Sequence, residues 1–503
     1  MRIRKLLRVR FVVYSFTEQE KIMAELTPMM QKYMETKEQY KDCILFYRLG
    51  DFYEMFFDDA IVASKELEIA LTGKSCGLEE RAPMCGIPYH AVETYLARLV
   101  SRGYKVAICE QVEDPKLAKG LVKREVIRVV TPGTNLDVQS LEASKNNYLM
   151  CIAYTSDGIG ISAADVTTGD YYVTEVEDLR KLKDELMKYE PSEIICNEAF
   201  LVSGYDVEDL KSRLHMSVSS LESHMFDDDG CRRILMRHFK VNTLIGLGVE
   251  EFPTGILAAG ALLQYLYDTQ KTDLEHFTHI SPYLTSKYML LDSSTRRNLE
   301  LTETLREKQK RGSLLWVLDK TKTAMGGRLL RNYIEQPLID KEEMEKRLDA
   351  IQELNQDSIS RDEIREYLNP VYDLERLLSK VTYKTANPRD LIAFRNSLQM
   401  LPPIKTVLAG FQKEELAAIR EEIDGLEDIY QLIDEAIVEE PPISIREGGM
   451  IKDQFDETID HLRAAKHDGK QWLVQLEEED RERTGIKTVS YTHLRAHETG
   501  RNL

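Results

Sequence analysis

The chain has 503 residues, of which 43% are hydrophobic and 30% are charged, a composition that is ordinary for a globular protein of about three domains. No run of about eighteen apolar residues is present, so no membrane-spanning helix is predicted. The seven cysteines form no CxxC pair, and this pattern is typical of reduced cytoplasmic thiols and argues against a zinc site. The net charge of −19 argues against a protein held on nucleic acid by overall charge alone, although residues 24–134 are near charge balance and the acidity is concentrated in the second half.

The first 22 residues place basic side chains among apolar ones, a pattern that could indicate a targeting peptide or a basic arm. Charges interrupt the apolar part, however, and no small-residue cleavage site follows it. We therefore predict that residues 1–22 are an extension without a function of its own.

Residues 45–56 have the pattern of a β-hairpin. Gly50 and Asp51 are turn residues, and the residues on both sides of them are rich in the aromatic and aliphatic types that favour strands. The pattern therefore predicts two antiparallel strands joined by a short turn.

The second strand of this hairpin places an aromatic ring beside a carboxylate. Because side chains alternate along a strand, Phe52 and Glu54 are predicted to share one face, with Tyr53 and Met55 on the other. This pairing suits a nucleobase, which can stack on the ring while its polar edge meets the carboxylate. The alternative is that Phe52 belongs to the core and that Glu54 is a solvated edge residue.

The rest of residues 24–134 is predicted to be a mixed α/β domain. A helix capped by Asp58 or Asp59 would follow the hairpin, a second helix would start near Ala91, and strands are expected at residues 105–109 and 124–131. The apolar face of the first helix is expected to carry Ala60, Ala63, Leu67 and Leu71. The fragment 73–75, Gly-Lys-Ser, is no phosphate-binding loop, because Glu68 stands where that motif needs Gly. Lys74 is predicted to be a loop lysine that contacts the phosphates of a nucleic-acid backbone, and the alternative is that it is only solvated.

A polar linker at residues 135–147 separates this domain from a second α/β pattern. Strands are predicted to Tyr154, at 158–165, at 170–174 and at 193–196, with a helix near 178–189. Asp165 lies near Asp170 in this pattern, and paired carboxylates can hold catalytic metal ions, so a metal-dependent nuclease is the alternative function. A second acidic group that could serve such a nuclease comprises Asp51, Glu54, Asp58 and Asp59.

After Pro282 the chain is predicted to be almost wholly helical. Leu315, Trp316 and Leu318 are expected in its core, and residues 453–483 are expected to form one long charged helix. His493 and His497 have helical spacing, but the sequence HLRAH lacks the glutamate of the zinc motif HExxH, so a zinc site is not predicted there.

Four sequence blocks occur in order: residues 50–56 (GDFYEMF), 83–90 (PMCGIPYH), 106–111 (VAICEQ) and 131–134 (TPGT). Together they resemble the MutS family of DNA mismatch repair proteins, and the resemblance continues from about residue 23 to residue 487. In that family the Phe of a Phe-x-Glu element wedges beside a mispaired base and the Glu hydrogen-bonds it, which implies these roles for Phe52 and Glu54. Leu49 and Lys74 are supporting candidates for DNA contact.

The resemblance implies a multidomain protein of α/β domains followed by an all-α region. The expected parts are a mixed α/β mismatch-recognition domain (residues 23–134), the linker (135–147), an RNase H-like connector (148–275), an incomplete helical core and lever (282–450), the start of a clamp (451–487) and an unrelated tail (488–503). The family's ATPase domain, which carries the main dimer contact, is expected to be missing.

The function implied is binding of double-stranded DNA that contains mismatches or small loops. A wedge in the minor groove bends the duplex by roughly 20–90°, and bending costs less where base pairing is already defective. The expected partners beyond DNA are a MutL-like protein docked on the connector and, in the full-length family, a second subunit, with no membrane involved. Because no stretch has GxxxxGK[ST], the chain is predicted to bind no ATP or Mg²⁺ and to be no enzyme. The resemblance further implies that it acts in a bacterial cytoplasm, at the nucleoid when bound to DNA.

Overall fold

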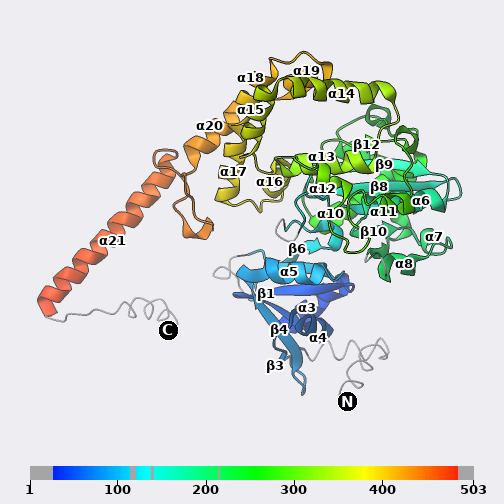
Figure 1. Cartoon of the computed structure of the whole chain (residues 1–503). Helices are drawn as coiled ribbons and strands as arrows, with labels where there is room; N and C mark the ends of the chain where they lie inside the picture. The colour runs from blue at the N-terminus through cyan, green and yellow to red at the C-terminus, as the bar shows by residue number, and fades with distance from the viewer. Residues whose placement is uncertain are drawn as a thin grey trace. The chain divides into compact units, whose positions relative to one another are not determined.

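The computed structural model describes residues 26–113, 120–137, 141–212, 214, 216–443 and 445–484 (Figure 1). The predictions for residues 1–22 and 488–503, including those for His493 and His497, fall outside these residues. Residue contacts divide the chain into two units, one comprising Met1–Ala386 with Met400–Ile423 and the other Asn387–Gln399 with Asp424–Leu503. Within the part of the chain that is described, no helix is long and apolar enough to cross a membrane.

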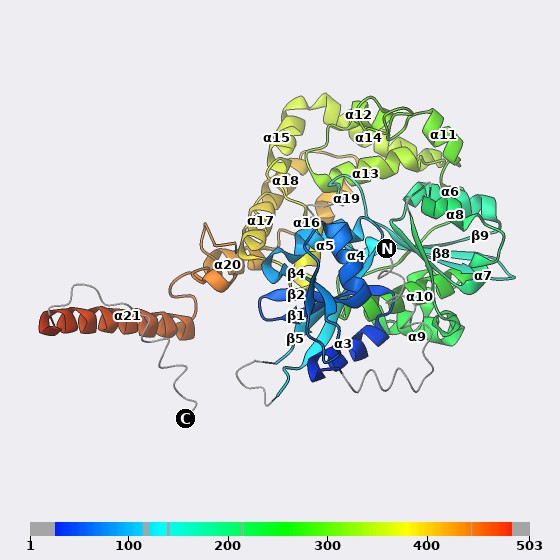
Figure 2. The same cartoon turned by 90° about the horizontal axis from the view of Figure 1, so that it is seen from below.

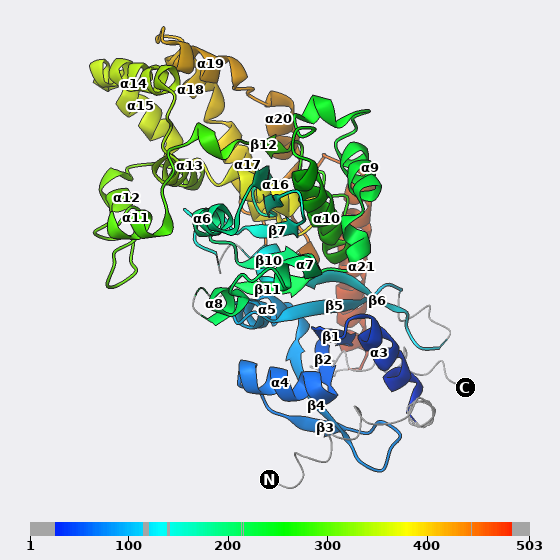
Figure 3. The ribbon, with the colours of Figure 1, turned by 90° about the vertical axis from the view of Figure 1, so that its right-hand side faces the viewer.

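The first unit begins with a six-stranded sheet whose strand order is β3-β4-β2-β1-β5-β6. Helix α3 (Pro28–Gln39) packs on one face, and α4 (Phe57–Leu67) and α5 (Val92–Val100) pack on the other (Figure 3). The predicted mixed α/β domain is confirmed, with one parallel pair, β1 with β5, among antiparallel neighbours. The strands are β1 (Cys43–Leu49), β2 (Phe52–Phe56), β3 (Thr72–Lys74), β4 (Ala82–Pro88), β5 (Lys105–Gln111) and β6 (Arg124–Val130).

Three local predictions in this region are wrong. Asp58 and Asp59 lie inside the first turn of α4 and do not cap it, although carboxylates there still favour the helix dipole. The helix ends before Glu68, which is left-handed, so Leu71 lies beyond it and is exposed. Lys74 belongs to edge strand β3 and not to a loop, because Thr72 to Lys74 pair with β4.

A second six-stranded sheet follows, with the order β11-β10-β7-β8-β9-β12. Strands β7, β8 and β9 are antiparallel neighbours, whereas β10 runs parallel to both β7 and β11, in agreement with the expected RNase H-like α/β layer. Helices α9 and α10 cover one face, and α6, α7 and α8 cover the other (Figure 2). The bounds are β7 (Leu149–Tyr154), β8 (Ile159–Asp165), β9 (Asp170–Val176), α6 (Leu179–Tyr189), β10 (Glu193–Cys196), α7 (Glu198–Leu201), α8 (Val207–Ser212), β11 (Ser217–Ser220), α9 (Asp228–His238), α10 (Pro253–Gln270) and β12 (Ser281–Pro282).

The remainder of the first unit is helical, as predicted. Buried Ala350, Ile404 and Leu408 hold α14, α15, α18 and α19 together. Leu315 is buried as expected, but Trp316 and Leu318 are 47% and 50% exposed, so their predicted place in the core is wrong. These helices are α11 (Ser293–Asn298), α12 (Leu314–Leu318), α13 (Ala324–Glu335), α14 (Lys341–Gln356), α15 (Ser358–Leu368), α16 (Leu374–Thr382), α18 (Leu401–Leu408) and α19 (Glu414–Glu422).

The second unit contains α17 (Pro388–Leu398), α20 (Glu427–Ala436) and the long helix α21 (Glu457–Thr484). The predicted charged helix at residues 453–483 is confirmed from Glu457 on, whereas residues 453–456 form a turn before it. The Arg395 guanidinium joins α17 to α20, because it lies 2.8 Å from carboxylate oxygens of both Asp434 and Glu439.

A buried polar network joins the two sheets of the first unit. Glu193 on β10 is fully buried and accepts hydrogen bonds from the Tyr265 hydroxyl at 2.8 Å, from the Gly133 amide at 3.2 Å and from the Thr131 hydroxyl. Lys105 of β5 places its ammonium 3.6 Å from the same carboxylate. Because Lys105 and Thr131 come from the first sheet's segment, this carboxylate fixes that segment against the second sheet.

A buried imidazole gives this region a predicted dependence on pH. His276 is 8% exposed and packs against the Tyr383 ring, and burial lowers its pKa to about 4. Between about pH 6.5 and pH 4 the unfolded chain binds one more proton at this residue than the folded chain does. The free energy of unfolding is therefore expected to fall as the pH falls, by about 1.4 kcal/mol per pH unit and by about 3 kcal/mol over the whole range.

Thermal unfolding of the wild type and of His276→Phe, followed from pH 4.5 to pH 7.5, tests this expectation. The variant should lose less stability than the wild type on acidification. His224→Phe is the control, because that side chain is 71% exposed, and its pH profile should match the wild type. Equal acid sensitivity of His276→Phe and the wild type would show that His276 does not contribute.

Candidate nucleic-acid interface

The predicted hairpin is confirmed, and its geometry places Phe52 directly after the turn. Strands β1 and β2 pair antiparallel with Leu49 opposite Phe52, Arg48 opposite Tyr53 and Tyr47 opposite Glu54. Gly50 takes a φ of +59°, a left-handed conformation that favours glycine. A turn of two residues in a fixed register gives the first side chain of β2 a defined position at the end of the sheet.

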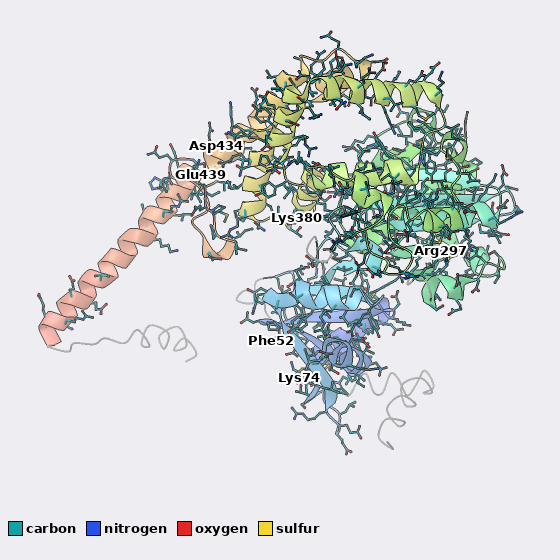
Figure 4. The ribbon with its side chains drawn as sticks, in the orientation of Figure 1. Phe52, Lys74, Arg297, Lys380, Asp434 and Glu439 are labelled. Carbon is teal, nitrogen blue, oxygen red and sulfur yellow. The ribbon has the colours of Figure 1, made fainter. Side chains whose placement is uncertain are left out.

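Phe52 is 47% exposed, which excludes its assignment to the core. Phe56, four residues further along the same face, is 1% exposed because Tyr33 of α3 packs edge-on against its ring. Helix α3 therefore covers the inner part of this face but leaves Phe52 uncovered. Figure 4 labels Phe52 and Lys74, which both belong to the first sheet.

Glu54 is not a solvated edge residue, because its side chain is only 17% exposed and is paired with Lys74. The Lys74 ammonium lies 2.5 Å from Oε2 of Glu54 and 5.6 Å from the centre of the Phe56 ring. The two residues that the sequence assigned to a base edge and to a phosphate thus neutralise each other in the free protein.

Strand β4 leaves space beside these side chains. Gly86 lies opposite Glu54, and a methyl group added to it would lie 3.6 Å from Cγ of Glu54 and 4.0 Å from Cδ1 of Phe52. Leu49, the cross-strand neighbour of Phe52, is partly buried against the core beneath α3. The structure therefore brings Leu49, Phe52, Glu54 and Lys74 together on one end of the first sheet.

Several residues on the other face of the hairpin were not identified from the sequence. The Arg48 guanidinium lies 3.8 Å above the Tyr89 ring and 3.2 Å from Oε1 of Glu110. Glu110 also accepts a hydrogen bond from the Tyr53 hydroxyl, whose pKa is raised by burial and then by this carboxylate. The block GIPYH and the strand VAICEQ contain Tyr89 and Glu110, but only the sheet register shows that they meet at Arg48.

The carboxylates proposed for the nuclease alternative are already occupied by internal donors. Asp165 is fully buried and accepts hydrogen bonds from Asn146, from the Asn147 amide and from both the amide and hydroxyl of Thr167, at 2.7 to 2.9 Å. Asp170 accepts from Asn146 at 2.9 Å and from the Thr168 hydroxyl at 2.8 Å.

The second acidic group does not converge on one point either. Asp59 is turned inward, where it pairs with Lys37 at 2.9 Å and accepts from the Leu45 amide, while Glu54 pairs with Lys74. Among the residues that the structure describes, no group of three or more His, Cys, Asp or Glu side chains could hold a metal ion. No observation favours a nuclease.

Comparison with known proteins identifies the family. Models of three of its domains match in order: MutS domain I at residues 27–139, MutS domain II at residues 147–280 and MutS domain III at residues 294–496. Proteins named DNA mismatch repair protein MutS are 64% identical over 473 residues in Lachnoclostridium phytofermentans, 53% over 470 residues in Ruminiclostridium cellulolyticum and 52% over 472 residues in Acetivibrio thermocellus.

These matches cover 93–94% of the chain but 51–54% of the relatives, so the chain spans about half the length of the curated relatives it matches. The four sequence blocks all lie within the match to domain I, and strands β7 to β11 of the second sheet lie within the match to domain II. The relatives are bacterial proteins that carry one name. The chain therefore belongs to the MutS family of DNA mismatch repair proteins.

Proposed function

We propose that this chain binds double-stranded DNA at mispaired or unpaired bases, with Phe52 as the wedge and Glu54 as the contact to the base edge. The observation that supports this most is the 47% exposure of Phe52 at the end of a sheet whose neighbouring aromatic residues on the same face are buried. An exposed ring next to a carboxylate has little value for folding, but it can stack on a base while the carboxylate meets a donor on the base edge.

The preference for defective sites follows from the cost of deforming DNA. Inserting a ring between base steps costs a few kcal/mol of unstacking and bends the duplex, and both costs fall where pairing is already broken. A mismatch is therefore recognised mainly by how easily it deforms, and the contact of Glu54 with a base edge adds to this preference.

The pair Glu54–Lys74 refines this mechanism. A carboxylate brought towards phosphates is repelled, and Lys74 offsets that repulsion while it lies 2.5 Å from Glu54. On DNA the ammonium can turn to a phosphate, and the freed carboxylate then needs a donor from a base. In correctly paired DNA the donors on the Watson–Crick edges are already bound to the partner base, so they are not free for this carboxylate.

Glu54→Ala is expected to raise affinity for correctly paired DNA at low salt and to narrow the preference for a mismatch. Removing the carboxylate removes both the repulsion from phosphates and the contact to the base edge. Titration of matched and mismatched duplexes at two salt concentrations measures both effects. Glu79→Ala, which makes the same change of charge at an exposed residue of the segment between β3 and β4, is the control.

The two variants separate a specific contact from a general charge effect. If Glu54→Ala and Glu79→Ala raise affinity equally for both duplexes, the base contact is wrong and only the charge matters. If Glu54→Ala changes neither affinity, Glu54 takes no part in binding.

The remaining proposals rest on membership of the family. We propose that the second α/β region docks a MutL-like partner, that the full-length protein forms a homodimer, and that it acts in the cytoplasm. The sequence contains no GxxxxGK[ST] stretch that could wrap a triphosphate, so we propose that this chain binds neither ATP nor Mg²⁺ and is not itself an enzyme.

A further inference from the structure

The turn that presents Phe52 is held from the face of the first sheet opposite Phe52. Arg48 and Tyr53 are paired across β1 and β2, so both lie on the side of α4 and α5, whereas Phe52 and Glu54 lie on the side of α3. Nε of Arg48 donates a hydrogen bond to the Gly50 carbonyl at 2.5 Å. Arg48 therefore reaches the turn without entering the face on which Phe52 stands.

Two contacts besides the hydrogen bond to Gly50 fix the Arg48 guanidinium itself. It lies 3.8 Å above the Tyr89 ring, its Nη1 is 3.2 Å from Oε1 of Glu110, and its side chain is only 11% exposed. The planar group thus stacks on a ring, pairs with a carboxylate and donates to a carbonyl at once, a combination that lysine cannot reproduce.

Tyr89 holds the other residue of the turn. Its backbone amide donates a hydrogen bond to the Asp51 carbonyl at 3.0 Å, so the carbonyl groups of both turn residues are bound. Tyr89 begins the 3₁₀ segment Tyr89–Ala91 that leads into α5, and Glu110 belongs to β5. The turn is thereby attached to two elements outside the hairpin.

A wedge must keep its position while it separates stacked bases. A flexible turn would have to become ordered when Phe52 stacks on a base, and the free energy of that ordering would reduce the gain from stacking. We propose that Arg48, held by Tyr89 and Glu110, is a positioning residue that keeps the Gly50–Asp51 turn rigid so that Phe52 discriminates between mismatched and paired DNA. This inference rests on the proposed wedge function of Phe52.

Arg48→Met in the full chain tests the proposal with two readouts. The loss of one hydrogen bond to a charged donor should speed hydrogen exchange at the Tyr89 amide by about tenfold and reduce the mismatch preference by about tenfold. Arg48→Lys should show most of both losses, because charge alone does not replace the planar group. Arg102→Met is the matched control, since Arg102 also binds a carbonyl and a carboxylate, both of Glu66.

Combining Arg48→Met with Phe52→Ala shows whether Arg48 acts through the wedge. If it does, the double variant should discriminate no worse than Phe52→Ala alone, because the two losses are not additive. Additive losses would show that Arg48 affects DNA by another route and would overturn the proposal. Full rescue by Arg48→Lys would overturn it too, because it would indicate a purely electrostatic role.

The outcomes also separate this inference from the function on which it rests. If Phe52→Ala leaves discrimination unchanged, the wedge itself is wrong. If Phe52→Ala abolishes discrimination but a folded Arg48→Met variant changes neither discrimination nor exchange at Tyr89, only the positioning role is wrong. If Arg48→Met does not melt cooperatively, Tyr89→Leu replaces it, because this variant removes the ring beneath Arg48 but keeps the backbone amide of residue 89. We expect Tyr89→Leu to speed hydrogen exchange at that amide and to reduce the mismatch preference.

Discussion

Phe52→Ala is expected to reduce the preference for mismatched over paired DNA by roughly 5- to 150-fold, because stacking on a base contributes about 1–3 kcal/mol. The fold should survive, since the ring is 47% exposed and contributes little to the core. Competition between two duplexes that differ by one base, measured together with thermal melting, reports both effects. Affinity for paired DNA should change less than affinity for the mismatch.

Ile61→Ala is the control for this experiment. Ile61 lies on α4 in the same region and is 44% exposed, so its truncation removes a similar exposed apolar side chain away from the hairpin. Its mismatch preference should match that of the wild type. Loss of cooperative melting in Phe52→Ala would return Phe52 to the core, and an unchanged preference in a folded variant would exclude it as the wedge.

The largest effect on stability is expected from Glu193→Ala. This variant leaves Lys105, which is 14% exposed, and the hydroxyl groups of Thr131 and Tyr265 without their buried acceptor. Removing one partner of a buried ion pair typically costs about 3–5 kcal/mol. Native-state hydrogen exchange at the amides of β10 should show a corresponding fall in the free energy of opening.

Glu177→Ala provides the comparison, because Glu177 is 84% exposed and pairs with Lys181 one helical turn away. Exposed pairs of this kind contribute little, so exchange in β10 should stay as in the wild type. If Glu193→Ala also leaves β10 unchanged, the network does not hold the two sheets together.

The sequence predicts those parts of the fold that depend on local patterns. Gly50 and Asp51 between two aromatic strands determine the hairpin, and the alternation of side chains then places Phe52 and Glu54 on one face. Four strands of the second sheet and helix α6 are predicted for the same reason, whereas the short edge strands β11 and β12 are not.

Features that depend on distant partners could not be predicted. The pairing of Lys74 with Glu54 requires β3 to pair with β4. Strand β3 has only three residues, and its sequence gives no alternating pattern that would predict it. Arg48 meets Tyr89 and Glu110 only through the register of three strands. The expectation that Trp316 and Leu318 are buried follows from their apolar side chains, yet the short helix α12 leaves both exposed.

The acidic residues illustrate the same limit. Two aspartates near each other suggest a metal site, but the sequence does not show that Asn146, Thr167 and Thr168 turn their donors towards Asp165 and Asp170. The predicted domain boundaries and the roles of Phe52, Glu54, Leu49 and Lys74 in binding stay predictions.

The most direct measurement is equilibrium binding of this 503-residue chain to two duplexes that are identical except for one mispair, over a range of salt concentrations. We expect tighter binding to the mismatched duplex at every salt concentration, and we expect Phe52→Ala to remove most of this difference. Equal affinity of the wild-type chain for the two duplexes across the whole range would contradict this expectation.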